Sequence, residues 1–332
     1  MEPIKIMVIG LGQWGQLWVE DILSLPLYKI VALVDTNIGN INTTCSKFKL
    51  DKEIGFLDPV KGIETTKPNA ALVVVPPEAH FSIAMQCIEH DLHVLSEKPL
   101  ANNMDEALAI REAVLNRKVK FMVSQDYRWQ PPIQALRKAI SENVIGKVGY
   151  ATYSHFQSLK IGGWREKMMN VLLEDMSIHH FDILRYIIGR ECDEIYAVSF
   201  NPSWSWYTGG ACVSASLIFE DSFVVNYFAT WITTGPIGSW PGEIRIEGEK
   251  GALTMNNNGE VKLLVGGSGK NIKPPKMEYM ARKYALKQFY DAIAKNQDPE
   301  TNVEDNIKSY AMIQAALMST RLHRPIRLKE LL

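Results

Sequence analysis

The sequence predicts an α/β protein with an N-terminal doubly wound parallel sheet, followed by an α+β domain with an open, mostly antiparallel sheet. Three observations support this prediction. The 332 residues exceed what one hydrophobic core usually supports. Up to residue 125, short apolar runs alternate with helical patterns. After residue 125, longer aromatic-rich runs replace this alternation.

The first domain is expected to span residues 1–124. Its strands are expected at 4–10, 29–35, 70–76, 93–97 and 119–125, and its helices at 13–25, 77–90 and 103–117. Strands that are apolar almost throughout and are interleaved with helices indicate a parallel sheet that is covered on both faces.

The second domain is expected to span residues 125–332. A helix at 131–142 precedes strand-like runs at 149–159, 210–220 and 222–232, and further helices are expected at 170–188, 277–296 and 303–321. A short turn around Asp221 joins two of the runs and predicts a hairpin. We expect the last helix to pack back on the first domain, and the Gly/Pro-rich segment 266–276 to be a mobile loop.

The overall composition argues against several classes of function. With 36 basic and 37 acidic residues, the net charge is −1, which makes nucleic acid and anionic membranes poor candidate partners. The four cysteines are far apart and form no CxxC pair, so we expect neither disulfides nor a metal site. The N-terminus begins with a strand and no apolar run reaches membrane-spanning length, so we expect a cytoplasmic protein.

A glycine motif follows the first expected strand. Gly10, Gly12 and Gly15 form a GxGxxG pattern that opens the first helix. In this context the glycines allow a tight turn, a close approach to a pyrophosphate and close helix packing. The second strand ends in Asp35, whose carboxylate can accept hydrogen bonds from an adenosine ribose. A simple glycine turn beside an exposed acid is the alternative, but the complete pattern favours a dinucleotide.

Asp35 also favours NAD over NADP. A carboxylate at this position repels a 2′-phosphate, and the following residues 36–40 contain no arginine.

The fourth expected strand ends in Glu97-Lys98-Pro99. Ligands of doubly wound sheets bind beyond the carboxyl ends of the strands, so Lys98 is expected near the reactive end of the cofactor. Proline fixes its own backbone dihedral and stiffens this turn. A solvated Glu-Lys pair is an equally good interpretation from the spacing alone.

Residues 172–189 combine titratable side chains with an amphipathic helix. Asp175, His179 and Asp182 return to one face at a spacing of four and three residues. A histidine with a carboxylate one turn away suits proton transfer. The adjacent His180 points about 100° away, so a shared metal ion is not expected and His180 is assigned a structural role. Asp182 could instead pair with Arg185 on the helix surface.

Taken together, these motifs resemble the glucose-fructose oxidoreductase, inositol dehydrogenase and rhizopine-catabolism (Gfo/Idh/MocA) family over nearly the whole chain. The resemblance rests on the glycine motif, on Glu97-Lys98-Pro99, on the segment 73–80 and on Asp175-xxx-His179-xx-Asp182. Segments 231–253 and 302–328 are also similar in pattern. The resemblance implies a Rossmann domain and an NAD(P)-dependent dehydrogenase that acts on a sugar, a polyol or a related cyclic alcohol.

The resemblance also implies roles for individual residues. Lys98 would hydrogen-bond the reacting hydroxyl, His179 would be its general base, and Asp175 would modulate that base. Cofactor contacts are implied for Gly10, Gly12, Gln13, Trp14, Gly15, Asp35, Pro76, His80, Glu97 and Lys98. Substrate-side positions are Arg128, His155, Trp164, Arg165 and Asp182. Bulky residues precede Asp175 where many relatives have glycines, which leaves the substrate open.

Two other functions compete with a dehydrogenase. Some relatives keep NAD bound and use transient oxidation to drive elimination or glycoside cleavage, without net NADH. A non-catalytic NAD-binding sensor or regulator is the other alternative, although a sensor needs no base beside the nicotinamide.

The run 222–232 predicts an assembly. Odd positions such as Phe223 and Tyr227 and even positions such as Val224 and Phe228 are both apolar. Few helices remain to cover a second face, and a contiguous apolar sheet face marks an interface. We therefore expect a homodimer or homotetramer that is built through the C-terminal sheet.

Overall fold

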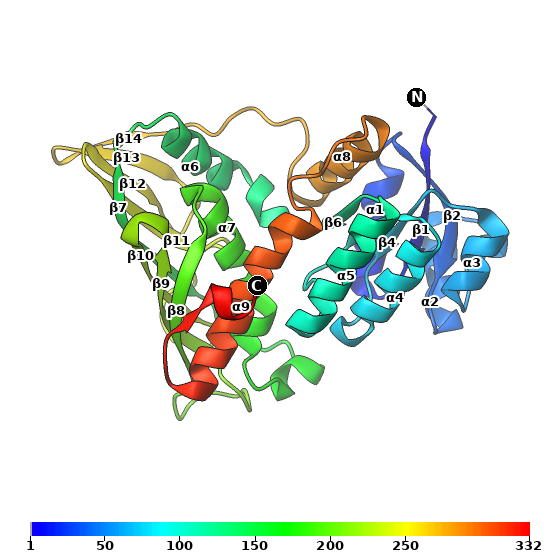
Figure 1. Cartoon of the computed structure of the whole chain (residues 1–332), viewed down its shortest axis with the longest axis horizontal. Helices are drawn as coiled ribbons and strands as arrows, with labels where there is room; N and C mark the ends of the chain where they lie inside the picture. The colour runs from blue at the N-terminus through cyan, green and yellow to red at the C-terminus, as the bar shows by residue number, and fades with distance from the viewer. Residues whose placement is uncertain (1) are drawn as a thin grey trace. The chain divides into compact units, whose positions relative to one another are not determined.

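The computed structural model describes residues 2–332, apart from the side chain of Trp164. The chain forms two compact units (Figure 1). The first contains residues 1–126 and 279–307, and the second contains 127–278 and 308–332. Within residues 2–332, no helix combines the length and the apolar character that a membrane crossing requires.

The first unit contains a six-stranded parallel sheet. The sequence predicts a parallel sheet with five of these strands and misses the two-residue strand at Gly55–Phe56. Its strand order is β3-β2-β1-β4-β5-β6, and every strand pair is parallel. The strands are β1 (Ile4–Ile9), β2 (Tyr28–Val34), β3 (Gly55–Phe56), β4 (Ala70–Val73), β5 (His93–Ser96) and β6 (Phe121–Val123). From β1 the chain continues to β2 and β3 on one side and to β4, β5 and β6 on the other. Because crossovers between parallel strands are right-handed, the helices on these two sides cover opposite faces of the sheet. All four side chains of β4 are buried, which explains the uninterrupted apolar run.

Three helices of this unit begin with a capping side chain. They are α1 (Gln13–Leu23), α2 (Ile38–Phe48), α3 (Pro59–Thr66), α4 (Pro77–Glu89), α5 (Met104–Arg117) and α8 (Ala281–Ala294). The side chains of Asn37, Asp58 and Asn103 cap α2, α3 and α5 by accepting hydrogen bonds from first-turn N–H groups. Helices α1, α4 and α8 have no side-chain cap.

The C-terminal part of the chain is divided between the units. The sequence places residues 277–296 in the second domain, whereas α8 lies in the first unit. The reason is a set of long-range contacts that the sequence does not reveal. Arg282 pairs with Asp21 at 2.8 Å, and the Tyr28 hydroxyl donates to the Leu286 carbonyl oxygen at 2.6 Å. Helix α9 (Val303–Leu322) starts in the first unit and continues in the second.

The second unit contains a nine-stranded mixed sheet with the order β14-β13-β12-β11-β7-β10-β9-β8-β15. Only β7 and β10 pair in parallel among the described strands of this sheet. The strands are β7 (Val148–Phe156), β8 (Cys192–Phe200), β9 (Cys212–Phe219), β10 (Phe223–Thr230), β11 (Glu243–Gly248), β12 (Gly251–Met255), β13 (Val261–Val265), β14 (Ser268–Asn271) and β15 (Ile326–Arg327). Its helices include α6 (Pro131–Ser141) and α7 (Ile178–Ile188).

Two turns in this sheet test the sequence analysis. The predicted hairpin around Asp221 is confirmed, because β9 and β10 pair with Phe219 opposite Phe223. The prediction that 266–276 is a loop is wrong for residues 268–271, which form β14 against β13. Gly266 and Gly267 both have positive φ and close a two-residue hairpin turn between these strands.

Candidate functional site

The glycine turn between β1 and α1 is tightly packed on one side and open on another. A Cβ atom at Gly10 would lie 2.1 Å from the Val74 carbonyl oxygen, and one at Gly15 would lie 1.9 Å from the Gly10 carbonyl oxygen. Gly10 also has a φ of +91°. At Gly12, by contrast, a Cβ would meet nothing within 4 Å. Gly10 and Gly15 are therefore required for packing, while Gly12 faces open space.

The N-terminus of α1 has no side-chain cap. Gly12 occupies the cap position, and Gln13 and Trp14 in the first turn are exposed. First-turn N–H groups without an internal partner can bind a phosphate, and the helix dipole favours its negative charge. The open space at Gly12 and the uncapped helix fit the pyrophosphate of a dinucleotide.

Asp35 lies beside this turn, at the end of β2. Its Oδ2 accepts a hydrogen bond from the Leu11 N–H at 2.8 Å, and its Oδ1 accepts one from the Asn37 N–H at 2.8 Å. The Asn40 side-chain amide also donates to Oδ2, at 3.2 Å. The carboxylate is therefore fixed in position. Because each carboxylate oxygen offers two acceptor sites, Asp35 retains capacity for a ribose hydroxyl.

Glu97 and Lys98 follow β5, at the same edge of the sheet as the glycine turn. Glu97 Oε1 accepts a hydrogen bond from the Trp18 indole N–H at 2.8 Å, and Oε2 accepts one from the Lys98 N–H at 3.2 Å. Burial raises the pKa of the Glu97 carboxyl, and these donors oppose the increase. The Lys98 side chain is half-buried, and the Lys98–Pro99 peptide bond is cis.

His80 holds two turns together. Its Nδ1 lies 2.7 Å from the Pro99 carbonyl oxygen, and its Nε2 lies 2.9 Å from the Val75 carbonyl oxygen. Burial lowers the pKa of this histidine. With both ring nitrogens engaged by the backbone, this geometry supports an indirect role for His80, that of positioning Pro76 and Lys98.

Gln125, just after β6, is a candidate site residue that no motif in the sequence indicates. Its side chain is 1% exposed, and neither its amide oxygen nor its amide nitrogen has a hydrogen-bond partner within the described residues. Buried polar groups are normally hydrogen-bonded. An unsatisfied carboxamide at the carboxyl edge of the sheet is thus a further feature that fits a bound ligand.

In the second unit, the predicted helix 170–188 is not regular. Residues Leu172–Ser177 form a π-helical turn, and α7 follows directly. The widened turn changes the face on which Asp175 lies relative to His179. The carboxylate of Asp175 pairs with Arg165, with Nε and Oδ2 2.7 Å apart. Turns of this kind often occur at functional sites.

His179 is stacked against Tyr127. The ring centroids are 4.4 Å apart with an interplanar angle of 12°, and His179 is 8% exposed. Sequence reasoning did not identify Tyr127, because the contact joins residues 52 positions apart. The stack fixes the plane of the imidazole.

Arg128 and Asp182 bind each other. Arg128 Nε and Nη2 donate to the two Asp182 oxygens at 2.6 Å each, and the side chains are 5% and 1% exposed. The Ser309 hydroxyl also donates to Asp182, at 2.6 Å. The suggested surface pair of Asp182 with Arg185 is wrong: α7 is buried on nearly all sides, and Arg185 instead pairs with Glu191 at 2.8 Å. This geometry supports a structural role for Arg128 and Asp182.

His155 and His180 lie in a buried aromatic cluster. Their ring centroids are 4.6 Å apart, and His180 Nδ1 lies 2.8 Å from the Tyr227 hydroxyl oxygen. Burial lowers the pKa of His155 to about 4 and that of His180 well below its usual value, so both rings are neutral at neutral pH. The structural role expected for His180 agrees with this contact. The interpretation of Trp164 concerns a side chain that is outside the described part of the chain.

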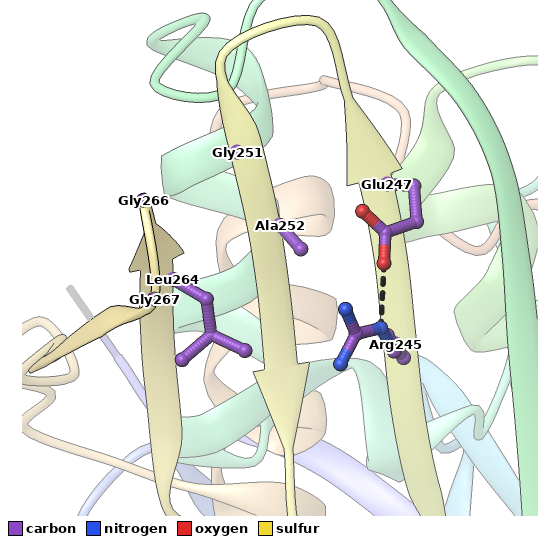
Figure 2. Close-up of a pocket in the computed structure, with 7 residues that line it drawn as sticks. All are labelled: Arg245, Glu247, Gly251, Ala252, Leu264, Gly266 and Gly267. Atoms are coloured by element: carbon purple, nitrogen blue, oxygen red, sulfur yellow. Dashed lines mark hydrogen bonds and ion pairs between the residues drawn. The ribbon is translucent and has the colours of Figure 1, made fainter.

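A surface hollow lies elsewhere in the second unit (Figure 2). It lies over β11, β12 and β13 and is lined by Arg245, Glu247, Gly251, Ala252, Leu264, Gly266 and Gly267. Arg245 and Glu247 pair with each other at 2.6 Å. None of the predicted site residues lines this hollow.

Known protein families match both parts of the chain. Residues 4–125 match the oxidoreductase family with an NAD-binding Rossmann fold, and residues 133–254 match the GFO/IDH/MocA C-terminal domain.

Individual relatives are distant in sequence but similar over their full length. A myo-inositol 2-dehydrogenase of Thermotoga maritima is 21% identical, with 99% of this chain and 100% of the relative covered. A D-apiose dehydrogenase of Paraburkholderia graminis is also 21% identical, with 100% and 91% covered. The crystal structure of an Agrobacterium radiobacter oxidoreductase in complex with NAD+, L-tartaric acid and magnesium is similar with a TM-score of 0.91. It is 18% identical to this chain, and 100% of each chain is covered.

Proposed function

Because this chain belongs to the GFO/IDH/MocA family of NAD-binding oxidoreductases, we propose that it transfers a hydride between nicotinamide and a sugar, a polyol or a related cyclic alcohol. One observation carries the proposal. The open glycine turn with its fixed Asp35, and the Lys98 turn after β5, lie at the same carboxyl edge of one parallel sheet. That edge is where doubly wound sheets bind nucleotide ligands.

The proposal assigns two side chains to the reacting hydroxyl group. His179 accepts its proton, and the stacked Tyr127 keeps the imidazole ring oriented for this transfer. Lys98 donates a hydrogen bond to the hydroxyl oxygen and stabilises the negative charge that develops there. The nicotinamide supplies the hydride acceptor, while the protein supplies position and charge. Asp175, held by Arg165, contributes negative charge on the π-helical turn.

A substrate screen tests the proposal. The wild-type protein is incubated with NAD+ and individual sugars and polyols, and NADH is followed by absorbance. The proposal expects at least one compound to yield NADH with wild type and not with the His179→Asn variant. Substrate turnover without net NADH would favour the elimination mechanism with bound NAD, and cofactor binding without any turnover would favour a sensor.

We propose that NAD is preferred over NADP because of Asp35. Its carboxylate is fixed by three donors, so it cannot easily turn away from a 2′-phosphate. Like-charge juxtaposition costs several kcal/mol, so NADP is expected to bind about a hundredfold more weakly. Asp35→Ala should reduce the difference between the affinities for NAD and NADP, whereas Asp105→Ala, at an exposed site, should leave this difference unchanged. Fluorescence titrations with NADH and NADPH measure both affinities, and a wild-type preference for NADPH would refute the assignment.

We also propose that the protein assembles through the open face of the second sheet. On β10, Phe223, Val225 and Tyr227 are buried, whereas Val224 and Phe228 on the other face are half-buried. The strand register places further apolar side chains on that second face, each between 40% and 56% exposed: Tyr150, Tyr196, Val198 and Phe200. In Figure 1, α6 and α7 lie along the opposite side of this sheet. The same face also carries the exposed polar side chains of Thr152, Ser214 and Asn226, so the proposed interface depends on the exposed apolar side chains that lie among them.

Light scattering at micromolar concentration tests this assembly. We expect a dimer or tetramer for the wild type and for Leu115→Lys, which changes an exposed apolar side chain on α5. Val198→Lys should shift the population towards smaller species, because it places a charge on the sheet face. A wild-type mass of 37.5 kDa, that of the monomer, would rule the interface out.

A further inference from the structure

Asp126 lies where two neighbouring strands end. Strands β5 and β6 are parallel, with Ser96 opposite Val123, and the Ser124 N–H donates to the Ser96 carbonyl oxygen at 2.8 Å. Glu97 and Lys98 follow β5 directly, and Asp126 follows β6 after two further residues. The two carboxyl groups and the lysine therefore share one edge of the sheet.

The other charged groups around Asp126 come from α8 and α1. Arg282 on α8 affects the Asp126 carboxyl electrostatically, as do Glu97 and Lys98. However, Arg282 already pairs with Asp21 at 2.8 Å and stacks over the Trp18 ring at 5.8 Å from the centroid. Arg282 and Lys98 are the two cations that act on both Glu97 and Asp126.

The surroundings of Asp126 favour the protonated form of its carboxyl group. Burial and repulsion from Glu97 raise the pKa of Asp126 to about 7, even though Arg282 and Lys98 act in the opposite direction. Burial also raises the pKa of Glu97. Two interacting carboxyl groups of this kind titrate as a pair, and near neutral pH this pair gains or loses one proton.

The strand order indicates which part of a dinucleotide lies here. Asp35 ends β2 on one side of β1, while β4, β5 and β6 follow on the other side. In this strand order, the two halves of a dinucleotide lie on opposite sides of the crevice beside β1. If Asp35 contacts the adenosine ribose, the nicotinamide lies towards the ends of β5 and β6.

We propose that Asp126 is a further positioning residue for the dehydrogenase reaction proposed above, and that its carboxylate form favours oxidised over reduced nicotinamide. The inference rests on the proposed function. The oxidised ring carries a positive charge and the reduced ring does not, so a carboxylate at this edge stabilises the oxidised form selectively. Binding of NAD+ then expels the proton of Asp126 into solvent, whereas binding of NADH leaves it in place.

The sign of the pH effect follows from this linkage. As the pH rises from 6 to 8, Asp126 loses its proton, and the affinity for NAD+ relative to NADH is expected to rise. If NAD+ lowers the pKa of Asp126 from about 7 by about one unit, the affinity ratio changes by about fivefold between pH 6 and 8 and by about tenfold over the complete transition, because the coupling between the proton and NAD+ is reciprocal. Calorimetry for NAD+ and fluorescence for NADH measure the two affinities without any substrate. Calorimetric titration of NAD+ at pH 7 in buffers of different ionisation enthalpy measures the released protons.

Three variants separate this role from a structural one. Asp126→Asn should bind both cofactors, and the ratio of its affinities for NAD+ and NADH should no longer depend on pH. Binding of NAD+ to this variant should release no proton. Glu97→Gln removes the repulsion and should move the pH transition of the ratio to lower pH. Asp105→Asn, at an exposed position on α5, should behave as wild type.

The outcomes distinguish the inference from the function on which it rests. The role of Asp126 is refuted if the ratio of the wild-type affinities for NAD+ and NADH does not vary with pH. It is also refuted if Asp126→Asn keeps the pH dependence of this ratio. In both cases the dehydrogenase proposal stands. If wild type binds neither cofactor, the proposed function itself fails.

Discussion

Replacing His179 with Asn is expected to lower kcat by about two to four powers of ten, the usual contribution of a positioned base. Asn keeps a similar size and polarity beside Tyr127, but it cannot accept the hydroxyl proton. Lys98→Met should lower kcat by a similar factor because it removes the donor to the hydroxyl oxygen. Initial rates on the compound identified by the screen measure both effects.

Cofactor affinity and a matched control show whether the loss is specific. His179→Asn should change NAD affinity little, because His179 is assigned to the substrate. His90→Asn changes an exposed histidine at the end of α4 and should leave kcat unchanged. Near-normal turnover of His179→Asn on its true substrate would show that another residue is the base.

Asp182→Asn is expected to destabilise the second unit by about 3–5 kcal/mol, the usual effect of breaking a buried ion pair. Asp182 accepts two hydrogen bonds from Arg128 and one from Ser309 in a region that is almost fully buried. Removing its charge takes away the carboxylate that accepts hydrogen bonds from Nε and Nη2 of the buried Arg128. Urea unfolding followed by circular dichroism measures the loss.

An exposed ion pair provides the comparison. Glu304→Gln breaks the ion pair between Glu304 and Arg111, whose side chains are 46% and 42% exposed. This substitution should lower the free energy of unfolding by less than about 1 kcal/mol. A double variant with apolar residues at 128 and 182 should recover part of the stability lost in Asp182→Asn. If Asp182→Asn unfolds like wild type but raises KM, the substrate contact implied by the family resemblance is right and the structural role is wrong.

Local patterns were sufficient to predict the parallel sheet and its glycine turn. Strands such as β4 are buried on both faces, so their apolar character appears in a few consecutive letters. The glycine turn is also a local feature. A Cβ atom at Gly15 would collide with the Gly10 carbonyl oxygen, and one at Gly10 would collide with the Val74 carbonyl oxygen. Asp35 was also correctly placed beside this turn, because a strand end is a local feature.

The pairing of Arg128 with Asp182 could not be predicted from spacing. The two residues are 54 positions apart, and a periodic pattern shows which face of an element a residue occupies but not what lies opposite that face. The π-helical turn before His179 cannot be predicted for a related reason, since an apolar pattern with 3.6 residues per turn does not show where one turn widens.

The sequence by itself therefore determined five of the six strands of the parallel sheet, the dinucleotide motif and the candidate base and lysine. Each of these depends on residues close together along the chain. Only the tertiary structure decided that α8 lies in the first unit, that Tyr127 stacks on His179, and that Asp126 shares an edge with Glu97. Because Asp126 is buried and lies near Glu97, its pKa is raised to about 7. Burial and electrostatic coupling are properties of the folded surroundings, so no single segment of the chain contains them.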